Sequence, residues 1–307
     1  MRFAALSIVV LVCLATAEPA AAHSRTPTIA LDYRVVLSSV PPGVHADVVD
    51  GDRSLQVSVA PGHTLLVRGL LGEPLLRFGP NGVWVNRSSP SASSDRIGRA
   101  GSGWALLTRG HAALWHDHRL APPPGLRDGQ TATWSVPVVV DGHAARLGGT
   151  FTRVGRPSLW PWLVTGILVA AAVAAFAHVQ PRRRAEEAAA VAAVAAVAAL
   201  AASAAFATGD AIAKPTEWLD VGAAAFLALL AGTALLLRRR GLRTWAATIV
   251  GVVAAAIGLG SLSVFRHGVV ISSLPASIAR LATAVALVGG AAAVVLAVTV
   301  SEKGARR

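Results

Sequence analysis

The chain has 307 residues, of which 54% are hydrophobic and only 14% are charged. A soluble domain contains about a quarter charged residues, so this composition indicates an integral membrane protein and excludes a wholly soluble one. The formal net charge of +12 does not indicate nucleic-acid binding, because many basic residues lie in short arginine clusters beside apolar runs, where membrane topology explains them.

Residues 1–22 have the pattern of a secretory signal peptide, with an early basic residue, an apolar run and small residues at the end. Cleavage after Ala22 makes His23 the new N-terminus, Ala17 offers a competing cleavage position, and an uncleaved anchor is the alternative. The sole cysteine, Cys13, lies inside this leader. We therefore expect a mature exported domain that has no disulfide and depends on its hydrophobic core.

Residues 23–157 predict an extracytoplasmic all-β domain, because hydrophobic and polar residues alternate in short runs separated by turn residues. Many short strands at this spacing favour a β-sandwich of the immunoglobulin-like or cupredoxin-like kind. A segment rich in Ser, Gly and Arg at 87–103 predicts a loop. The expected strands are residues 29–38, 54–59, 64–70, 75–78, 83–86, 103–107, 113–118, 131–140 and 145–154.

Residues 158–307 predict a transmembrane domain of five helices, because they contain five apolar runs long enough for a bilayer core that needs roughly 20 helical residues. Arginine clusters at 182–184 and 238–240 and the basic residues after position 300 follow alternate runs. The positive-inside rule places these clusters in the cytoplasm, so the β-domain lies outside the cytoplasmic membrane and the C-terminus inside. The expected helices are residues 159–179, 188–208, 218–237, 244–265 and 278–300.

The five runs carry no ionisable residue at mid-depth, where transporters and proton pumps keep such residues. His178 and Asp220 lie near the ends of their runs and can reach water. Small residues such as Gly251, Ala255 and Gly258 favour close helix packing. The pattern indicates a membrane anchor or a partner-binding bundle rather than a pump.

The segment Trp115-His116-Asp117-His118-Arg119 is the densest cluster of metal-ligand side chains in the chain. If residues 113–118 form a strand, His116 and His118 project from the same face and are candidate ligands for one copper or zinc ion. The alternative is structural. Trp115 and Arg119 can pack and pair with Asp117, which makes the segment a rigid brace with polar tips.

A second candidate metal site begins with Asp141-Gly142-His143 and continues with Gly148-Gly149-Thr150-Phe151. These residues resemble the end of the small periplasmic copper-resistance proteins of the CopC type. The resemblance implies a Cu(II) site made of the amine and ring of His23 with Asp141 and His143, and such ligands suit the tetragonal geometry of Cu(II). The alternative is an Asp-Gly turn that closes an ordinary hairpin.

A wider set of motifs is spread over the outer domain and the first expected helix. The motifs are Asp32-Tyr33-Arg34, Gly72-Glu73-Pro74-Leu75-Leu76-Arg77-Phe78-Gly79-Pro80-Asn81-Gly82-Val83-Trp84, Asn86-Arg87-Ser88-Ser89-Pro90, Trp115-His116-Asp117-His118-Arg119 and Pro157-Ser158-Leu159-Trp160-Pro161-Trp162. Together they resemble a family of actinobacterial membrane proteins of unassigned function. The resemblance implies a signal peptide, an outer β-domain and a C-terminal helical bundle, and it supplies no activity.

No motif indicates an enzyme: the chain has no nucleophile elbow, zinc-protease helix or phosphate-binding Gly loop, and we expect Glu73 and Arg77 to form an ion pair that stabilises the fold. We therefore predict a non-enzymatic cell-envelope protein that binds a ligand or another envelope protein, contacts the lipid bilayer and binds no nucleic acid. The alternative is a copper-handling envelope protein, with copper as its only candidate cofactor. A transporter and an enzyme rank below both.

Overall fold

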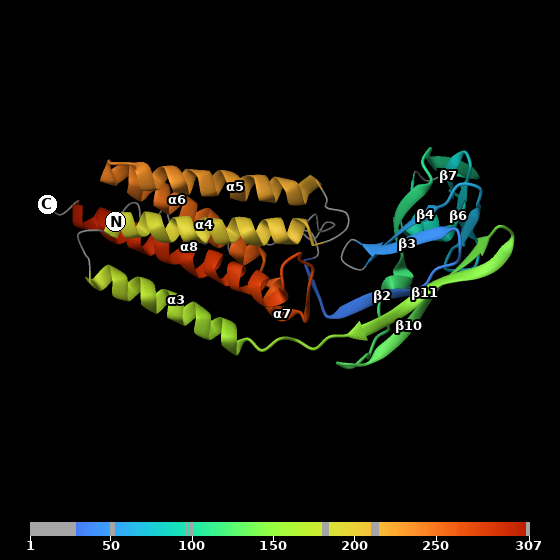
Figure 1. Ribbon diagram of the computed structural model, residues 1–307, viewed down its shortest axis with the longest axis horizontal. Helices are drawn as coiled ribbons and strands as arrows, with labels where there is room; N and C mark the ends of the chain where they lie inside the picture. Colours follow the sequence, from blue (N-terminus) through green and yellow to red (C-terminus); the bar gives the residue numbers. More distant parts are fainter. Residues whose placement is uncertain are drawn as a thin grey trace. The chain divides into compact units, whose positions relative to one another are not determined.

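The computed structural model describes residues 29–49, 53–95, 97–98, 101–179, 184–209 and 215–304. It divides into two compact units, a strand unit of Leu31–Gly155 and a helical unit of Arg156–Arg307 that also includes the chain up to Ala30 (Figure 1). The predicted signal peptide, residues 1–22, and the candidate ligand His23 lie outside the described residues.

The larger sheet of the strand unit has seven antiparallel strands in the order β2-β11-β10-β5-β6-β7-β8. Alternation of apolar and polar residues assigns its two faces. In β10, Trp134, Val136 and Val138 are buried, whereas the intervening Ser135 and Pro137 are exposed. The strands are β2 (Tyr33–Ser39), β5 (Leu65–Arg68), β6 (Pro74–Gly79), β7 (Gly82–Asn86), β8 (Trp104–Thr108), β10 (Thr131–Val140) and β11 (His143–Arg153).

A second sheet has three antiparallel strands, β3 (Val44–Val49), β4 (Ser54–Val59) and β9 (Ala112–His116), in the order β3-β4-β9. Most of its buried hydrophobic side chains belong to the same hydrophobic cluster as those of the larger sheet. Full burial of one Leu, Val or Phe side chain contributes about 1.5–3 kcal/mol, so this shared core stabilises a domain without a disulfide. Central members are Leu55, Val57 and Trp115 from the smaller sheet and Val67, Leu76 and Phe78 from the larger one.

The segment that the sequence predicts as a loop contains a short helix, α2 (Pro90–Ser94). Ser89 is its N-cap, because the Ser89 Oγ accepts a hydrogen bond from the Ala92 N–H at 3.3 Å. Proline at the first helical position and serine at the N-cap are both preferred helix starts. The segment is thus not wholly a loop, and Asp95 at the end of α2 contributes a carboxylate to the candidate site.

The helical unit contains α3 (Trp160–Val179), α4 (Arg184–Ala207), α5 (Pro215–Leu236), α6 (Arg240–Gly260), α7 (Ser263–Arg266) and α8 (Ala276–Gly304). Within the described residues, four stretches are long and apolar enough to cross a membrane: Ala185–Ala207, Trp218–Leu236, Arg240–Arg266 and Ala276–Thr299. The apolar stretch Trp160–Ala175 is shorter. The prediction of a β-rich domain joined to helices that are long and apolar enough to span a membrane is confirmed at this level.

Small residues allow the helices to approach closely. The buried face of α4 consists almost entirely of alanines. A Cβ atom added at Gly251 of α6 would lie only 2.7 Å from the Gly290 carbonyl oxygen of α8, and one at Gly258 would lie 2.8 Å from the Leu287 Cβ. Helices in lipid associate through such van der Waals contact between small residues. The expected packing role of Gly251 and Gly258 is confirmed.

The start of the described chain packs against the helical unit. Ile29, just before β1 (Ala30–Leu31), accepts a hydrogen bond at 2.9 Å from the Ile271 N–H, which follows β12 (Val269–Val270). Near these residues Arg280, which is only 8% exposed, donates to the carbonyl oxygens of Val264, His267 and Gly268. An arginine at the end of a membrane helix is tolerated when backbone carbonyls accept its hydrogen bonds.

We expect Gly251→Val to destabilise the helical unit by roughly 1–3 kcal/mol, because the new side chain overlaps the α8 backbone. The matched control is Gly232→Val in α5, where an added Cβ meets nothing within 4 Å. Thermal unfolding in detergent, followed by circular dichroism, measures both variants. Equal melting temperatures for the two variants would contradict the close contact of α6 and α8.

Candidate functional site

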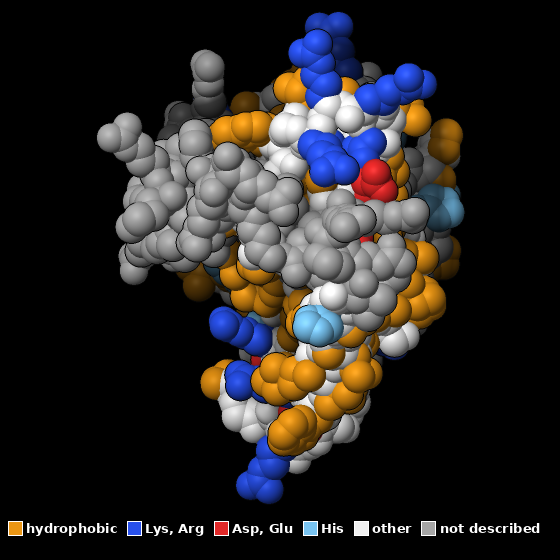
Figure 2. Space-filling model, turned by 90° about the vertical axis from the view of Figure 1, so that its left-hand side faces the viewer, with side chains coloured by type: hydrophobic (Ala, Val, Ile, Leu, Met, Phe, Trp, Pro, Cys, Tyr) orange, Lys and Arg blue, Asp and Glu red, His pale blue; other side chains and the backbone are white. Residues whose placement is uncertain are grey.

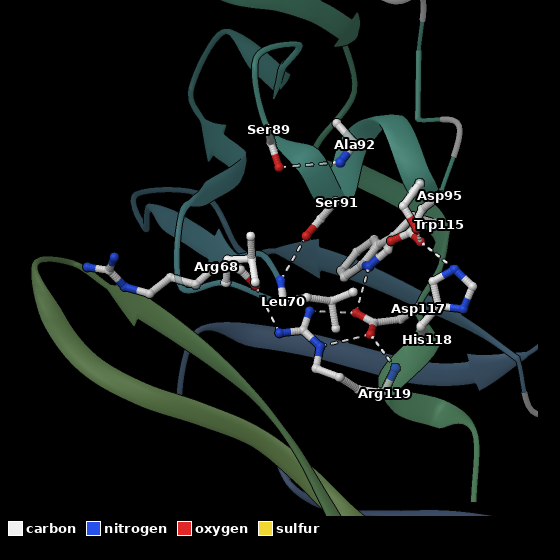
Figure 3. Close-up of polar contacts among 12 residues, drawn as sticks. Arg68, Leu70, Ser89, Ser91, Ala92, Asp95, Trp115, Asp117, His118 and Arg119 are labelled. Atoms are coloured by element: carbon white, nitrogen blue, oxygen red, sulfur yellow. Dashed lines mark hydrogen bonds and ion pairs between the residues drawn. The ribbon is translucent and has the colours of Figure 1, made fainter.

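The Trp115–Arg119 segment does not continue as one strand (Figure 3). Strand β9 ends at His116, and a short 3₁₀ helix, η1 (His118–Leu120), begins directly after Asp117. Asp117 is the N-cap of this helix, since its side chain accepts the Arg119 N–H at 3.0 Å. The predicted strand through residue 118 is therefore wrong at its end, where a buried aspartate turns the chain.

Asp117 is only 2% exposed, and both of its carboxylate oxygens accept hydrogen bonds. Oδ1 accepts from the Arg119 Nε at 2.8 Å as well as from the Arg119 backbone N–H. Oδ2 accepts from the Arg119 Nη2 at 2.7 Å and from the Trp115 Nε1 at 3.0 Å. This forked arginine–carboxylate pair is the structural alternative that the sequence left open, and it occupies the Asp117 oxygens with donors from the protein.

Asp117 remains ionised at neutral pH. Burial by itself raises the pKa of this carboxyl group, but the hydrogen bonds and the positive charge of Arg119 outweigh burial and hold the pKa below its usual value. A buried carboxylate with a paired arginine is stable in this form, whereas one that loses its partner is strongly destabilising.

Arg119 joins the two sheets. Its Nη1 donates at 2.9 Å to the carbonyl oxygen of Arg68 in β5, while its remaining side-chain bonds go to Asp117 at the end of β9. The Asp117 N–H in turn donates at 3.2 Å to the Arg53 carbonyl oxygen, just before β4. We call Trp115, Asp117 and Arg119 the Asp117 brace, because these contacts link the smaller sheet to the larger one.

His116 and His118 lie next to each other although the strand ends between them. Their ring centroids are 5.3 Å apart, and the rings meet edge to face. His118 Nε2 lies 3.1 Å from Oδ1 of Asp95, the residue that ends α2. Burial raises the pKa of the Asp95 carboxyl group. Among the described residues, no group of three or more His, Cys, Asp or Glu side chains is arranged to hold a metal ion, and metal binding by this histidine pair stays a prediction.

The second candidate site forms a tight hairpin. Asp141 and Gly142 have φ values of 50° and 82° and connect β10 to β11, so the expected Asp-Gly turn is present. The Asp141 carboxylate faces His63, whose Nδ1 is 2.6 Å from Oδ2, and it also accepts the Thr64 N–H at 2.7 Å. His143 Nδ1 lies 3.0 Å from the carbonyl oxygen of Asp141.

The Asp141 carboxylate, a candidate ligand of the CopC-like site, already contacts His63 and Thr64. The hydrogen bond with His63 lowers the pKa of the Asp141 carboxyl group, with a further contribution from the Thr64 N–H. His63 is not among the expected ligands, and its separation of 78 positions from Asp141 conceals the pair in the sequence. Because His23 lies outside the described residues, a site made of His23, Asp141 and His143 stays a prediction.

Glu73 and Arg77 do not form the expected ion pair. Glu73 Oε1 accepts the Ser89 hydroxyl at 2.7 Å and the Ser91 N–H at 3.2 Å, and Oε2 accepts the Leu71 N–H at 3.0 Å. Burial raises the pKa of Glu73, but the hydrogen bonds from Ser89 and Ser91 outweigh it and lower the pKa to about 2. Glu73 thus ties the turn between β5 and β6 to the start of α2.

Arg77 lies instead on the exposed face of the larger sheet, against two tryptophans. Its guanidinium carbon is 5.9 Å from the ring centroid of Trp84 and 5.1 Å from that of Trp104. A groove of about 460 Å³ runs beside these residues and includes Leu66 and Val139. Sequence reasoning missed this group, although the alternation of β6 and β7 places Arg77 and Trp84 on the same outward face.

No protein-family model, no curated protein and no solved structure matches this chain. The resemblances to the actinobacterial membrane-protein family and to the CopC-type proteins therefore stay predictions. The function has to be argued from the contacts described above.

We expect Asp117→Asn to destabilise the strand unit by about 3 kcal/mol, because it leaves the partly buried Arg119 guanidinium without its counter-charge. Asp47→Asn, at an exposed position of β3, is the control and should change stability by less than about 0.5 kcal/mol. Urea unfolding followed by tryptophan fluorescence gives both values. Equal losses of stability in the two variants would contradict the claim that the Asp117 brace stabilises the strand unit.

Replacement of Glu73 by Gln should destabilise the protein at pH 7, and the deficit should shrink as the pH falls. A carboxylate whose pKa is depressed by folding stabilises the protein above its unfolded value, 4.5, and loses that contribution as the pH falls toward about 2. Urea unfolding of both proteins at several pH values between 7 and roughly 2 measures the difference. A difference that is independent of pH would show that Glu73 does not stabilise the fold as a carboxylate.

Proposed function

We propose that this chain is a non-enzymatic protein of the cell envelope, which presents a ligand- or partner-binding β-sandwich outside the cytoplasmic membrane on a five-helix anchor. The observation that carries the proposal is that the buried polar group of the strand unit is used internally, whereas a charged group on its outer face is exposed. The Asp117 carboxylate is saturated with internal hydrogen-bond donors, whereas Arg77 is exposed on a grooved outer face. A fully satisfied buried carboxylate supports structure rather than acid–base chemistry.

The sandwich assignment is supported by two sheets whose buried side chains form one cluster. In β-sandwiches, alternate residues of both sheets point into such a shared core. We favour the immunoglobulin-like or cupredoxin-like kind, as expected from the many short strands.

The five-helix anchor adds α3 to the four candidate spans. Helix α3 has 20 residues, which is about the length that a bilayer core requires. An odd number of spans puts the strand unit and the C-terminus on opposite sides of the membrane.

The positions of basic residues near the helix ends support a cytoplasmic C-terminus and an external strand unit. Figure 2 shows a group of Lys and Arg side chains at the top of the view beside apolar side chains, with further Lys and Arg side chains at the lower left and at the bottom. Arg243, near the start of α6, forms an ion pair of 3.2 Å with Glu186 near the start of α4. Arg238 and Arg239 lie between α5 and α6, and Arg240 is the first residue of α6. Such arginine-rich connections belong on the cytoplasmic side.

Cysteine labelling tests this topology, because the chain has no cysteine other than Cys13. In a Cys13→Ala background, we expect Ser135→Cys on β10 to react with a membrane-impermeant maleimide in intact spheroplasts. Arg307→Cys should react only after permeabilisation. Labelling of Arg307→Cys in intact spheroplasts, or protection of Ser135→Cys, would contradict the proposal.

Copper handling is the second candidate function, favoured by the 5.3 Å separation of the His116 and His118 rings. A bound ion would use both imidazoles, since histidine is a preferred ligand of copper and zinc. The set of His23, Asp141 and His143 is the other candidate copper site, and it requires His23 to be the mature N-terminus.

Calorimetric titration of the purified full chain with Cu(II) and Zn(II) tests the copper alternative. If the histidine pair binds copper, replacing both His116 and His118 with Gln should abolish binding, whereas His45→Gln on β3 should not. If His143→Gln alone abolishes it, the second site is the metal site. Equal binding by wild type and all variants would refute both sites.

A further inference from the structure

The outer face of the larger sheet carries a continuous row of side chains across five strands. Val139 of β10 is paired with Leu66 of β5, Leu66 with Arg77 of β6, Arg77 with Trp84 of β7, and Trp84 with Leu106 of β8. Directly paired residues project from the same face of a sheet. Because the neighbouring row belongs to the hydrophobic core, this row faces outward.

Part of this row lines the groove of about 460 Å³. Ligand pockets of proteins range from about 300 to 1,000 Å³, so the groove fits a small molecule. Leu66, Val139 and Trp84 supply apolar surface. Thr64 and Asn81 add polar side chains at turns beside the strands.

Arg77 supplies the one cation among the residues that line this groove. Trp84 and Trp104 lie within 5.9 Å and 5.1 Å of its guanidinium carbon, close enough for cation–π contact with both rings. A guanidinium stacked on an aromatic ring keeps the N–H donors at its edge free for a forked contact with an oxoanion. In the described part of the chain, no Asp or Glu forms an ion pair with Arg77.

These features indicate which chemical groups a ligand of the groove would carry. A stacked arginine loses less side-chain freedom on binding than a freely moving one. The apolar surface of Leu66, Val139 and Trp84 favours a flat, hydrophobic body beside the bound anion.

We propose that this groove binds a small molecule in which a carboxylate or phosphate group is attached to a flat apolar ring. The oxoanion binds the edge of the Arg77 guanidinium, and the ring packs on Leu66, Val139 and Trp84. This inference rests on the proposed function, because it names the ligand class of the binding domain.

Fluorine NMR with the full chain in nanodiscs of zwitterionic lipid tests the proposal. The probes are 4-fluorobenzoate and 4-fluorophenyl phosphate, and 4-fluorobenzamide is the neutral match. We expect at least one anion to broaden and shift on titration, and the amide to bind at least roughly tenfold more weakly, as expected for loss of a charge-assisted contact. The anion that binds more tightly identifies the carboxylate or the phosphate as the natural group.

Variants locate the site. Arg77→Gln should weaken anion binding by roughly tenfold or more, and Arg77→Lys should weaken it less, because lysine keeps the charge and loses the planar fork. The control is Arg34→Gln on the exposed face of β2, which is four positions from β6 in the strand order. Absence of anion binding, equal binding of the amide, or equal loss in the Arg34 and Arg77 variants would overturn the proposal.

The outcomes separate this inference from the proposed function. If neither anion binds while Ser135→Cys is labelled outside the membrane, the groove assignment fails and the envelope assignment stands. If an anion binds through Arg77 and the labelling pattern is reversed, the groove assignment stands and the proposed topology fails.

Discussion

The strand unit depends on one buried charge, the carboxylate of Asp117. Moving a carboxylate from water into a protein interior costs several kcal/mol unless a counter-charge and hydrogen bonds replace its hydration. Arg119 supplies the counter-charge and three hydrogen bonds, and Trp115 supplies a fourth. Because Arg119 also donates to the Arg68 carbonyl oxygen, the same charge pair connects the smaller sheet to the larger one.

The contacts around α2 extend this link. His118, in the 3₁₀ helix that Asp117 caps, pairs with Asp95 at the end of α2. At the other end of α2, the Ser91 hydroxyl oxygen accepts the Leu70 N–H (Figure 3). There Glu73 also accepts the Ser89 hydroxyl. Two connections of the larger sheet and the end of β9 are thus held together by polar contacts. Arg77 of β6 and Trp84 of β7 project instead from the outward face of the sheet, where the Arg77 guanidinium lies over the Trp84 ring.

The sequence predicts those features that depend on neighbouring residues. The Asp141-Gly142 turn, the alternation of β10 and the close packing at Gly251 all follow from local rules, and each is present. Strand β3 is not among the expected strands, although the alternation of Val44, Ala46 and Val48 with His45 and Asp47 is a local signal that could have predicted it.

Features that depend on distant partners could not be predicted. Asp141 pairs with His63, and Arg119 reaches Arg68, 51 residues away. The turn at Asp117 follows from these tertiary contacts, because an aspartate within an alternating run is compatible with a continued strand until its buried partners are known. For the same reason the sequence identified His116 and His118 as candidate ligands, whereas it assigned Arg77 to an ion pair with Glu73 and did not predict its contacts with Trp84 of β7 and Trp104 of β8.

The coupling between Asp117 and Arg119 is the most direct test of this account. A double-mutant cycle of Asp117→Asn, Arg119→Met and the double variant, measured by urea unfolding of the strand unit in the full chain, isolates the pairwise free energy. We predict a coupling of about 2 kcal/mol or more, with the double variant more stable than the sum of the single effects allows. Additive effects, within about 0.5 kcal/mol, would contradict the claim that this pair holds the two sheets together.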